Sequence, residues 1–316
     1  MIRGSGKIAF IVNPNAAKGS TGREWPHIKA AARDRLGPFQ SHITAKPAEA
    51  TRFARMVLRA GAELVICVGG DGTLNEVVNG FMDGEGHPVR RDAVLGFIPR
   101  GTGCDFRRSA LVPREVNEAL DLISARRVRP IDLGLLEYLD HTGAPARRYF
   151  HNVTSFGIGG EVDERVNRSG NLFGGFVSFI WATIVSFLIY SKKRIHLKVG
   201  DDYDQHVTIW NVAVANGQYH GGGMWVAPAA SLVDGLFHVT VIGDLSLPVV
   251  FRELRNLYNG RIYQVEKVRM VTGKRVEASS DQRVLLDVDG EQPGRLPAVI
   301  EMVPGRLRFL AGLGGA

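Results

Sequence analysis

Residues 65–76 read VICVGGDGTLNE: an apolar run stops at two glycines and is followed by an aspartate, a third glycine and a threonine. Apolar residues then recur at helical spacing, at Leu74, Val77, Val78 and Phe81. The pattern predicts a buried strand, a tight turn and the start of a helix. Glycines let a ligand approach the backbone, and amide groups at a helix N-terminus favour an anion such as phosphate. An ordinary strand-to-helix turn is the alternative interpretation.

The acid inside this turn suggests its chemistry. The carboxylate of Asp71 would repel a phosphate unless a cation lay between them, so the turn favours a divalent metal, most simply Mg²⁺. Further acids lie at the ends of expected strands or in glycine turns, namely Asp105, Asp132, Asp289 and Glu291. Each acid alone has a structural explanation, because aspartate bonds its own backbone in turns. Together, beside glycine-rich loops, they favour phosphoryl transfer from a metal-bound nucleotide.

The composition limits the class of protein. The chain has 316 residues, 45% of them apolar, and a net charge of +7, which favours anionic partners. It has no arginine-rich tail or RNA-binding aromatic signature, so we predict no nucleic-acid partner. Cys67 and Cys104 offer neither a disulfide framework nor a zinc spacing, so a reducing cytoplasm is predicted. The apolar run 8–12 is too short for a secretory core and is expected to be the first strand.

Two patterns divide the chain near Gly134. Before it, strands at 7–12, 41–44, 65–68 and 93–98 alternate with helices at 25–36, 48–60 and 116–123, which is typical of parallel βαβ units. The loops 13–19, 69–73 and 101–105 are therefore expected at one edge of the sheet, where ligands bind. After it, period-two segments at 195–199, 207–214, 237–242, 283–288 and 298–303 predict a mostly antiparallel sheet or sandwich. We predict domains of residues 1–134 and 135–303.

Residues 172–191 contain no charge and end at Lys192-Lys193-Arg194. At about 1.5 Å per residue, a helix of this length could span a bilayer. A single span there would put the two halves of one sandwich on opposite sides of the membrane, so a buried helix is the favoured interpretation. An apolar surface that touches the membrane or a lipid tail is the other.

Eight segments occur in an order that resembles one family. They are Asn13-Pro14 with Gly19 and Gly22; 69–75; 99–106; 131–134; Asn152 with Gly157; 216–224; Pro228 with Asp234-Gly235; and 289–291. The chain thereby resembles the diacylglycerol kinase and sphingosine kinase family of lipid kinases, particularly its soluble bacterial members. The GGDGT element alone also occurs in NAD kinases and phosphofructokinases.

The resemblance implies a fold and a set of site residues. The fold is an α/β nucleotide-binding domain, phosphofructokinase/NAD-kinase-like, plus a mostly antiparallel β-sandwich domain that takes the lipid. Residues 304–316 return to the first domain, and the active site lies in the cleft between the two. ATP is expected to be surrounded by Asn13, Thr44, Gly69, Gly70, Asp71, Gly72, Thr73, Leu74, Asn75 and Thr102.

The family also implies roles for the acids. Asp71, Asp105 and Asp132 would organise Mg²⁺, and Glu291 or Asp289 would accept the proton of the lipid hydroxyl. Two carboxylates this close would titrate as a coupled pair, so the base stays open between them. A structural Mg²⁺ site is implied at Ser231, Asp234 and Leu236.

The chain departs from the family at a few positions. Cys104 stands where the family usually has asparagine, and a thiol lacks the paired donor and acceptor of an amide. Ala17 replaces a frequent glycine, and Val233 replaces a frequent second acid. No predicted catalytic acid is lost.

The function expected from the sequence is Mg²⁺- and ATP-dependent phosphorylation of a hydroxyl on diacylglycerol or a related lipid. A soluble NAD-type kinase and a non-catalytic lipid- or nucleotide-binding protein are the alternatives. A cytoplasmic protein with transient contact to a membrane surface is expected. The identity of the lipid and the oligomeric state stay open, with a homodimer as one option.

Overall fold

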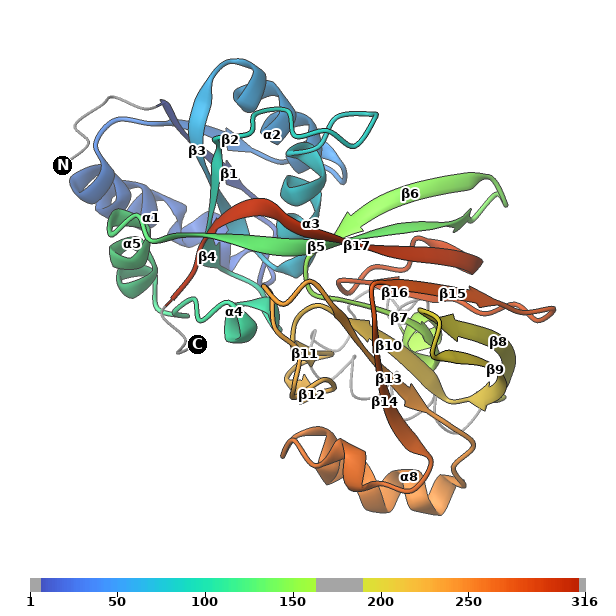
Figure 1. Cartoon of the computed structure of the whole chain (residues 1–316). Helices are drawn as coiled ribbons and strands as arrows, with labels where there is room; N and C mark the ends of the chain where they lie inside the picture. Colours follow the sequence, from blue (N-terminus) through green and yellow to red (C-terminus); the bar gives the residue numbers. More distant parts are fainter. Residues whose placement is uncertain (1–6, 163–189, 313–316) are drawn as a thin grey trace. The chain divides into compact units, whose positions relative to one another are not determined.

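The computed structural model of the protein describes residues 7–162 and 190–312. The chain divides into two compact units: unit 1 holds Met1–Ile131 and Gly305–Ala316, and unit 2 holds Asp132–Pro304. Two long strands, β5 (Val128–Asp140) and β17 (Gly294–Leu310), run from one unit into the other (Figure 1). The charge-free stretch 172–191 lies outside the described residues, apart from its last two. Among the described residues, no helix is long and apolar enough to cross a membrane.

Unit 1 is a parallel sheet with helices, as the alternating pattern predicts. The strand order is β2-β1-β3-β4-β17, and every neighbouring pair is parallel. Its other strands are β1 (Lys7–Val12), β2 (Gln40–Ile43), β3 (Ala62–Gly69) and β4 (Val94–Pro99). Its helices are α1 (Ser20–Leu36), α2 (Glu49–Arg59), α3 (Asp71–Gly80), α4 (Phe106–Ser109) and α5 (Val116–Ser124).

The continuous apolar run of β3 reflects burial on both faces of the sheet. All residues from Leu64 to Val68 are 0% exposed. Alternate side chains of β1 and β3, such as Phe10 and Ile66, pack in one cluster with Ile28 of α1 and Leu120 of α5. This packing fixes the strand ends from which the glycine loops emerge.

Helix α1 begins at Ser20, five residues before the predicted start at Trp25. Its first turn is polar, so it carries no apolar period. The turn is held by a tertiary contact instead: the hydroxyl of Thr21 donates to the carbonyls of Ala16 (3.1 Å) and Arg100 (3.3 Å).

Unit 2 is a sandwich of antiparallel strands. One sheet has the order β17-β15-β8-β9, with β5 beside β17 and β6 beside β5, and the other has the order β14-β13-β10-β7-β16. The side chains of both sheets meet in one core, which includes Phe150, Phe156, Leu197, Phe237 and Ile300. The strands are β6 (Pro145–Phe150), β7 (Val153–Gly157), β8 (Lys193–Val199), β9 (Tyr203–Ile209), β10 (Asn211–Ala215), β13 (Phe237–Ile242), β14 (Val268–Gly273), β15 (Arg275–Ser279) and β16 (Leu286–Val288).

Smaller elements complete unit 2. The hairpin of β11 (Tyr219–His220) and β12 (Met224–Trp225) covers the end of segment 216–224, one of those that carry the family resemblance, and extends one residue beyond it. A helical stretch follows β13: α8 (Leu247–Glu253), then the short 3₁₀ turns η1 (Leu254–Leu257) and η2 (Ile262–Gln264).

The single strand expected over 207–214 is wrong. β9 ends at Ile209 and pairs with β8, whereas β10 begins at Asn211 in the other sheet, between β7 and β13. The chain crosses between the sheets at Trp210, whose indole donates to the carbonyl of Leu245 at 2.8 Å. The core-facing positions shift by one residue at the crossing, from Val207 and Ile209 in β9 to Val212 and Val214 in β10. The apolar Trp210 between them packs in a different cluster, and it hid this shift in the sequence.

Glu76 of α3 caps the N-terminus of α2, which has no capping side chain of its own. One carboxylate oxygen accepts the amide of Ala48 (2.8 Å) and the other accepts the amide of Ala50 (3.0 Å). We expect Glu76→Ala to lower the free energy of unfolding by about 1–2 kcal/mol, since the capping bonds and the charge at the helix end are lost together. Urea denaturation measures this. Glu63→Ala, an exposed control, is expected to change it by less than about 0.5 kcal/mol, and equal effects would contradict the capping role.

Candidate active site

Two glycine loops of unit 1 touch backbone to backbone at the carboxyl ends of β3 and β4. A Cβ on Gly101 would lie 2.6 Å from the Cα of Gly70 and 2.9 Å from the sulfur of Cys104. The amide of Arg100 donates to the carbonyl of Gly69 at 2.6 Å. A Cβ on Gly69 would lie 2.7 Å from the hydroxyl of Thr73. These contacts require glycine and leave the backbone of both loops open to close approach by a ligand.

The loops bring two predicted metal-organising acids together. A carboxylate oxygen of Asp71 accepts the amide of Asp105 at 3.0 Å. Asp105 is 5% exposed, and its own carboxylate lies 3.9 Å from Nε of Arg108. Mg²⁺ in nucleotide sites is commonly held by one or two carboxylates together with waters and phosphate oxygens, so these two side chains fit that ion.

Cys104 adopts a left-handed conformation, with φ of +49°, between these acids. Its sulfur lies 3.9 Å from the carbonyl of Gly69. Burial raises the pKa of the Cys104 thiol to about 12, and the charge of Asp71 adds to this effect. The group therefore stays a neutral thiol near pH 7 and does not act as a thiolate ligand.

The remaining residues predicted around ATP lie at the same edge of the sheet. The amide nitrogen of the Asn13 side chain donates to the hydroxyl of Thr73 at 2.9 Å, which joins the loop after β1 to the first turn of α3. The amide of Thr44, after β2, donates to the carbonyl of Val12 at 2.9 Å. Thr102 is exposed at the tip of its loop. Leu74 and Asn75 are 0% exposed, so their side chains belong to the interior.

Asp132 is bonded within unit 2. One carboxylate oxygen accepts the amide of Gly235 at 2.7 Å, and its own amide donates to the carbonyl of Leu232 at 2.8 Å. This is the loop of the predicted structural metal site. There, Asp234 accepts the amide of Leu236 (3.0 Å), and its second oxygen lies 3.0 Å from Nε2 of His238.

A cluster of three or more His, Cys, Asp or Glu side chains placed to hold a metal is not found in residues 7–162 and 190–312. The hydroxyl of Ser231 lies 3.4 Å from the amide of Val233, within the same loop. Both predicted Mg²⁺ sites stay predictions.

The carboxylate of Asp289 is buried and hydrogen-bonded on both oxygens. The side chain is 0% exposed. One oxygen accepts the amides of Asn152 (3.1 Å) and Val153 (3.0 Å), and the other accepts the amide of His151 (3.1 Å) and lies 2.8 Å from that residue's Nδ1. These bonds tie the turn to the chain before β7 and leave the carboxylate engaged on both oxygens.

Glu291 differs from Asp289 in its surroundings. Its side chain is 39% exposed and one carboxylate oxygen lies 2.5 Å from Nη2 of Arg148. Its amide and carbonyl pair with Val288 across the turn, which sets the direction of the side chain. Of the two acids left open as the base, Glu291 is the one with a partly exposed carboxylate, and the choice between them stays a prediction.

The sequence did not predict a second buried acid, Asp287, that also holds this turn. Asp287 is 2% exposed; one oxygen accepts the amide of Gly290 (2.9 Å), and the other lies 2.7 Å from Nε2 of His220 and 3.4 Å from the hydroxyl of Ser155. The available signals were the spacing of two between Asp287 and Asp289 and the place of His220 in the segment 216–224. The alternation of β16 instead suggested an ordinary strand residue.

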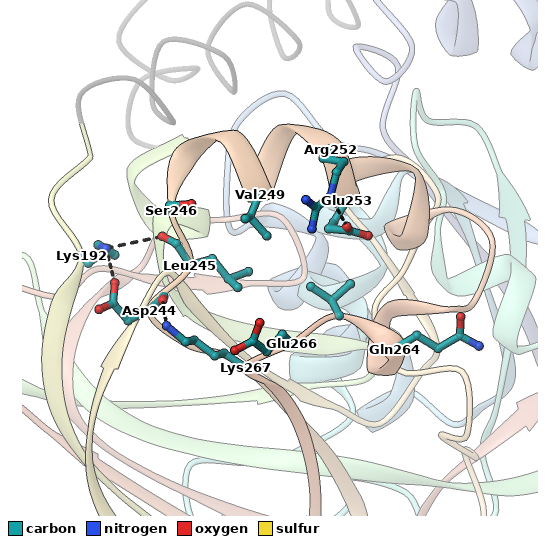
Figure 2. Close-up of a pocket in the computed structure, with 11 residues that line it drawn as sticks. Lys192, Asp244, Leu245, Ser246, Val249, Arg252, Glu253, Gln264, Glu266 and Lys267 are labelled. Carbon is teal, nitrogen blue, oxygen red and sulfur yellow. Dashed lines mark hydrogen bonds and ion pairs between the residues drawn. The ribbon is translucent and has the colours of Figure 1, made fainter.

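The pocket in Figure 2 lies elsewhere in unit 2. It has a volume of about 500 Å³. Mostly charged and polar side chains line it, from α8 and from the chain before and after that helix, including Lys192, Asp244, Arg252, Glu253, Glu266 and Lys267. No residue predicted for the active site belongs to it.

The glycine contact in unit 1 gives a stability prediction. We expect Gly101→Ala to lower the free energy of unfolding by about 1–3 kcal/mol, because the added methyl overlaps the backbone of Gly70. Gly84→Ala is a matched control, since a Cβ there meets nothing within 4 Å. Urea denaturation of the two variants should separate them, and equal stability would contradict the close approach.

The buried turn at Asp289 in unit 2 gives a further prediction about stability. We expect Asp289→Asn to lower the free energy of unfolding by about 3 kcal/mol, because an amide nitrogen then faces backbone N–H donors in the interior. Glu291→Gln, two residues away and partly exposed, should leave stability within about 0.5 kcal/mol. Thermal unfolding followed by circular dichroism measures both, and an unchanged Asp289→Asn variant would contradict the structural role of this carboxylate.

Comparisons with known proteins identify the family. Residues 7–136 match the family model described as "Diacylglycerol kinase catalytic domain", and residues 152–311 match "YegS C-terminal NAD kinase beta sandwich-like domain". The chain is 27% identical over 296 residues to the diacylglycerol kinase of Staphylococcus aureus (strain MRSA252), covering 92% of this chain and 88% of that protein. It is 28% identical over 297 residues to that of Staphylococcus carnosus (strain TM300), covering 92% and 90%.

A solved structure shares the fold over nearly its whole length. It is the crystal structure of a diacylglycerol kinase from Bacillus anthracis str. Sterne, with a TM-score of 0.75, 23% identity and coverage of 97% of each chain. At this identity the likeness supports the α/β domain and the sandwich, and the family models carry the assignment. The chain belongs to the diacylglycerol kinase family of lipid kinases.

Proposed function

We propose that this enzyme transfers the γ-phosphate of ATP to a hydroxyl of diacylglycerol or a related lipid, with Mg²⁺ as the metal. The observation that carries the proposal is the backbone contact between the two glycine loops of unit 1, with Asp71 and Asp105 one hydrogen bond apart beside it. The lipid class comes from the names of the staphylococcal relatives.

The donor side of the reaction belongs to unit 1. The amides at the start of α3 and in the loop after β4 are suited to phosphate oxygens, since backbone N–H groups at a helix N-terminus favour negative charge. Asn13, Thr44 and Thr102 would border the rest of the nucleotide. Asp71 and Asp105 would hold Mg²⁺, which supplies positive charge to the transferring phosphate when bound.

The acceptor side belongs to unit 2. We assign Glu291 as the group that takes the proton of the lipid hydroxyl, because its carboxylate is accessible while that of Asp289 is sealed. Arg148 would orient Glu291 through their 2.5 Å contact. Asp289 acts as a positioning residue that fixes the turn. The loop with Asp132, Ser231, Asp234 and Leu236 is proposed to hold a second, structural Mg²⁺.

The sharpest test is transfer of radiolabelled phosphate from ATP to diacylglycerol in mixed micelles with Mg²⁺. We expect Glu291→Gln to lower kcat by about 10²–10⁴-fold with little change in the KM for ATP, because it removes a general base without touching the donor loops. Glu137→Gln is the control, an exposed glutamate of the same unit. Full activity of Glu291→Gln would refute its role.

The substrate class is tested in the same assay. A panel of diacylglycerol, sphingoid base and phosphatidylglycerol identifies the acceptor, and NAD without lipid tests the alternative of a soluble small-molecule kinase. Phosphorylated NAD and no labelled lipid would overturn the proposed function.

A further inference from the structure

One helical face of unit 2 exposes aromatic and basic side chains together. From α8 through η1 to the residue that follows it, five exposed residues recur at spacings of three and four and so share one side of the helical path: Pro248, Phe251, Arg252, Arg255 and Tyr258. The side chains of Phe251 and Tyr258 are large, and these residues are 43% and 57% exposed. We call Phe251, Arg252, Arg255 and Tyr258 the α8 face (α8 is labelled in Figure 1).

The opposite side of this stretch is already buried. Val250 packs in a cluster with Trp210, Leu245 and Val265. Leu254 and Leu257 line an apolar cavity of about 60 Å³ with the strands beneath. The helix is therefore anchored by its own apolar side, while Phe251 and Tyr258 present 43% and 57% of their surface to solvent. Clustered large apolar side chains on a surface indicate an interaction site.

The charge around the α8 face favours an anionic partner. Residues 247–264 contain three arginines, Arg252, Arg255 and Arg261, against one glutamate, Glu253, a net charge of +2. In the neighbouring pocket the charges oppose one another instead: Lys192 pairs with Asp244, and Lys267 lies beside Glu266 in the lining (Figure 2). Arg252 pairs with Glu253 at 2.7 Å and both line that pocket, so the excess positive charge lies on Arg255 of the α8 face and on the exposed Arg261, three residues past Tyr258.

We propose that the α8 face docks on an anionic lipid bilayer. Aromatic side chains are favoured at the headgroup level of a membrane, where one part of the ring is apolar and the surroundings are polar. Arginine beside them pairs with lipid phosphates and gains from the negative surface potential. The inference rests on the proposed function in one respect: an enzyme whose acceptor is a membrane lipid must reach the bilayer.

The test is co-sedimentation of the full-length protein with vesicles of phosphatidylcholine, with and without phosphatidylglycerol, and with no diacylglycerol or ATP present. The variant Phe251→Ser/Arg255→Gln removes one ring and one charge of the α8 face. Its matched control is Met56→Ser/Arg59→Gln, which removes one exposed apolar side chain and one exposed arginine from helix α2 of unit 1. Both variants alter surface residues and net charge equally.

We expect the wild-type protein to bind vesicles with phosphatidylglycerol more tightly than vesicles of phosphatidylcholine alone. High salt should reduce this difference in affinity. The affinity of the α8 variant for these vesicles should fall roughly fivefold through loss of the arginine and roughly tenfold through loss of the phenylalanine. The combined loss is about fiftyfold, while the affinity of the control variant should stay within about twofold of wild type. Equal binding by the two variants, or no vesicle binding by the wild type at low salt, would overturn the inference. A protein partner on this face would give that same negative result.

Activity on a short-chain diacylglycerol dissolved in micelles separates the two proposals. The α8 variant should retain wild-type kcat there, since its substitutions lie outside the residues proposed for phosphoryl transfer. Normal micelle activity with unchanged vesicle binding would refute the docking surface alone. Vesicle binding that depends on the α8 face, in a protein that phosphorylates no lipid, would refute the proposed function alone.

Discussion

The contact between the backbones of Gly70 and Gly101 is the constraint on which the proposed nucleotide site of unit 1 depends. β3 and β4 are parallel neighbours, with Gly69 in register with Pro99, so their loops leave the sheet side by side. Because neither glycine has a Cβ, the loops close to contact. This closure puts the carboxylate of Asp71 on the amide of Asp105. The carboxyl ends of neighbouring parallel strands lie at one edge of the sheet, and this is why the two acids meet beside the backbone of these loops.

In unit 2, two buried carboxylates, Asp287 and Asp289, hold the turn from which the partly exposed Glu291 extends. A buried charge is costly unless it is paired and hydrogen-bonded, and Asp289 meets this condition with three backbone amides and His151. Asp287 holds the amide of Gly290 from the other side and is itself paired with His220. The turn between them is fixed at both ends, so Glu291 projects from a rigid support.

The sequence predicts the two-part architecture and the glycine loops because these depend on local patterns. It could not separate Asp289 from Glu291, since a spacing of two says nothing about burial; the sealing of Asp289 comes from residues 136 to 138 positions earlier in the chain. The crossing at Trp210 was hidden for a related reason: both strands turn apolar side chains to one core, and the apolar Trp210 between them masks the change of phase. Non-local contacts account for both.

Cys104 shows how a departure from a family pattern can be absorbed by the backbone. The position needs a residue that tolerates a left-handed φ of +49°, which asparagine adopts more readily than most residues. Cysteine pays this small conformational cost, and its thiol fills the space beside Gly101 while remaining neutral. The bond from the amide of Asp105 to Asp71 uses no atom of the Cys104 side chain. The geometry that joins the two acids therefore depends on the path of the loop and not on the side chain at position 104.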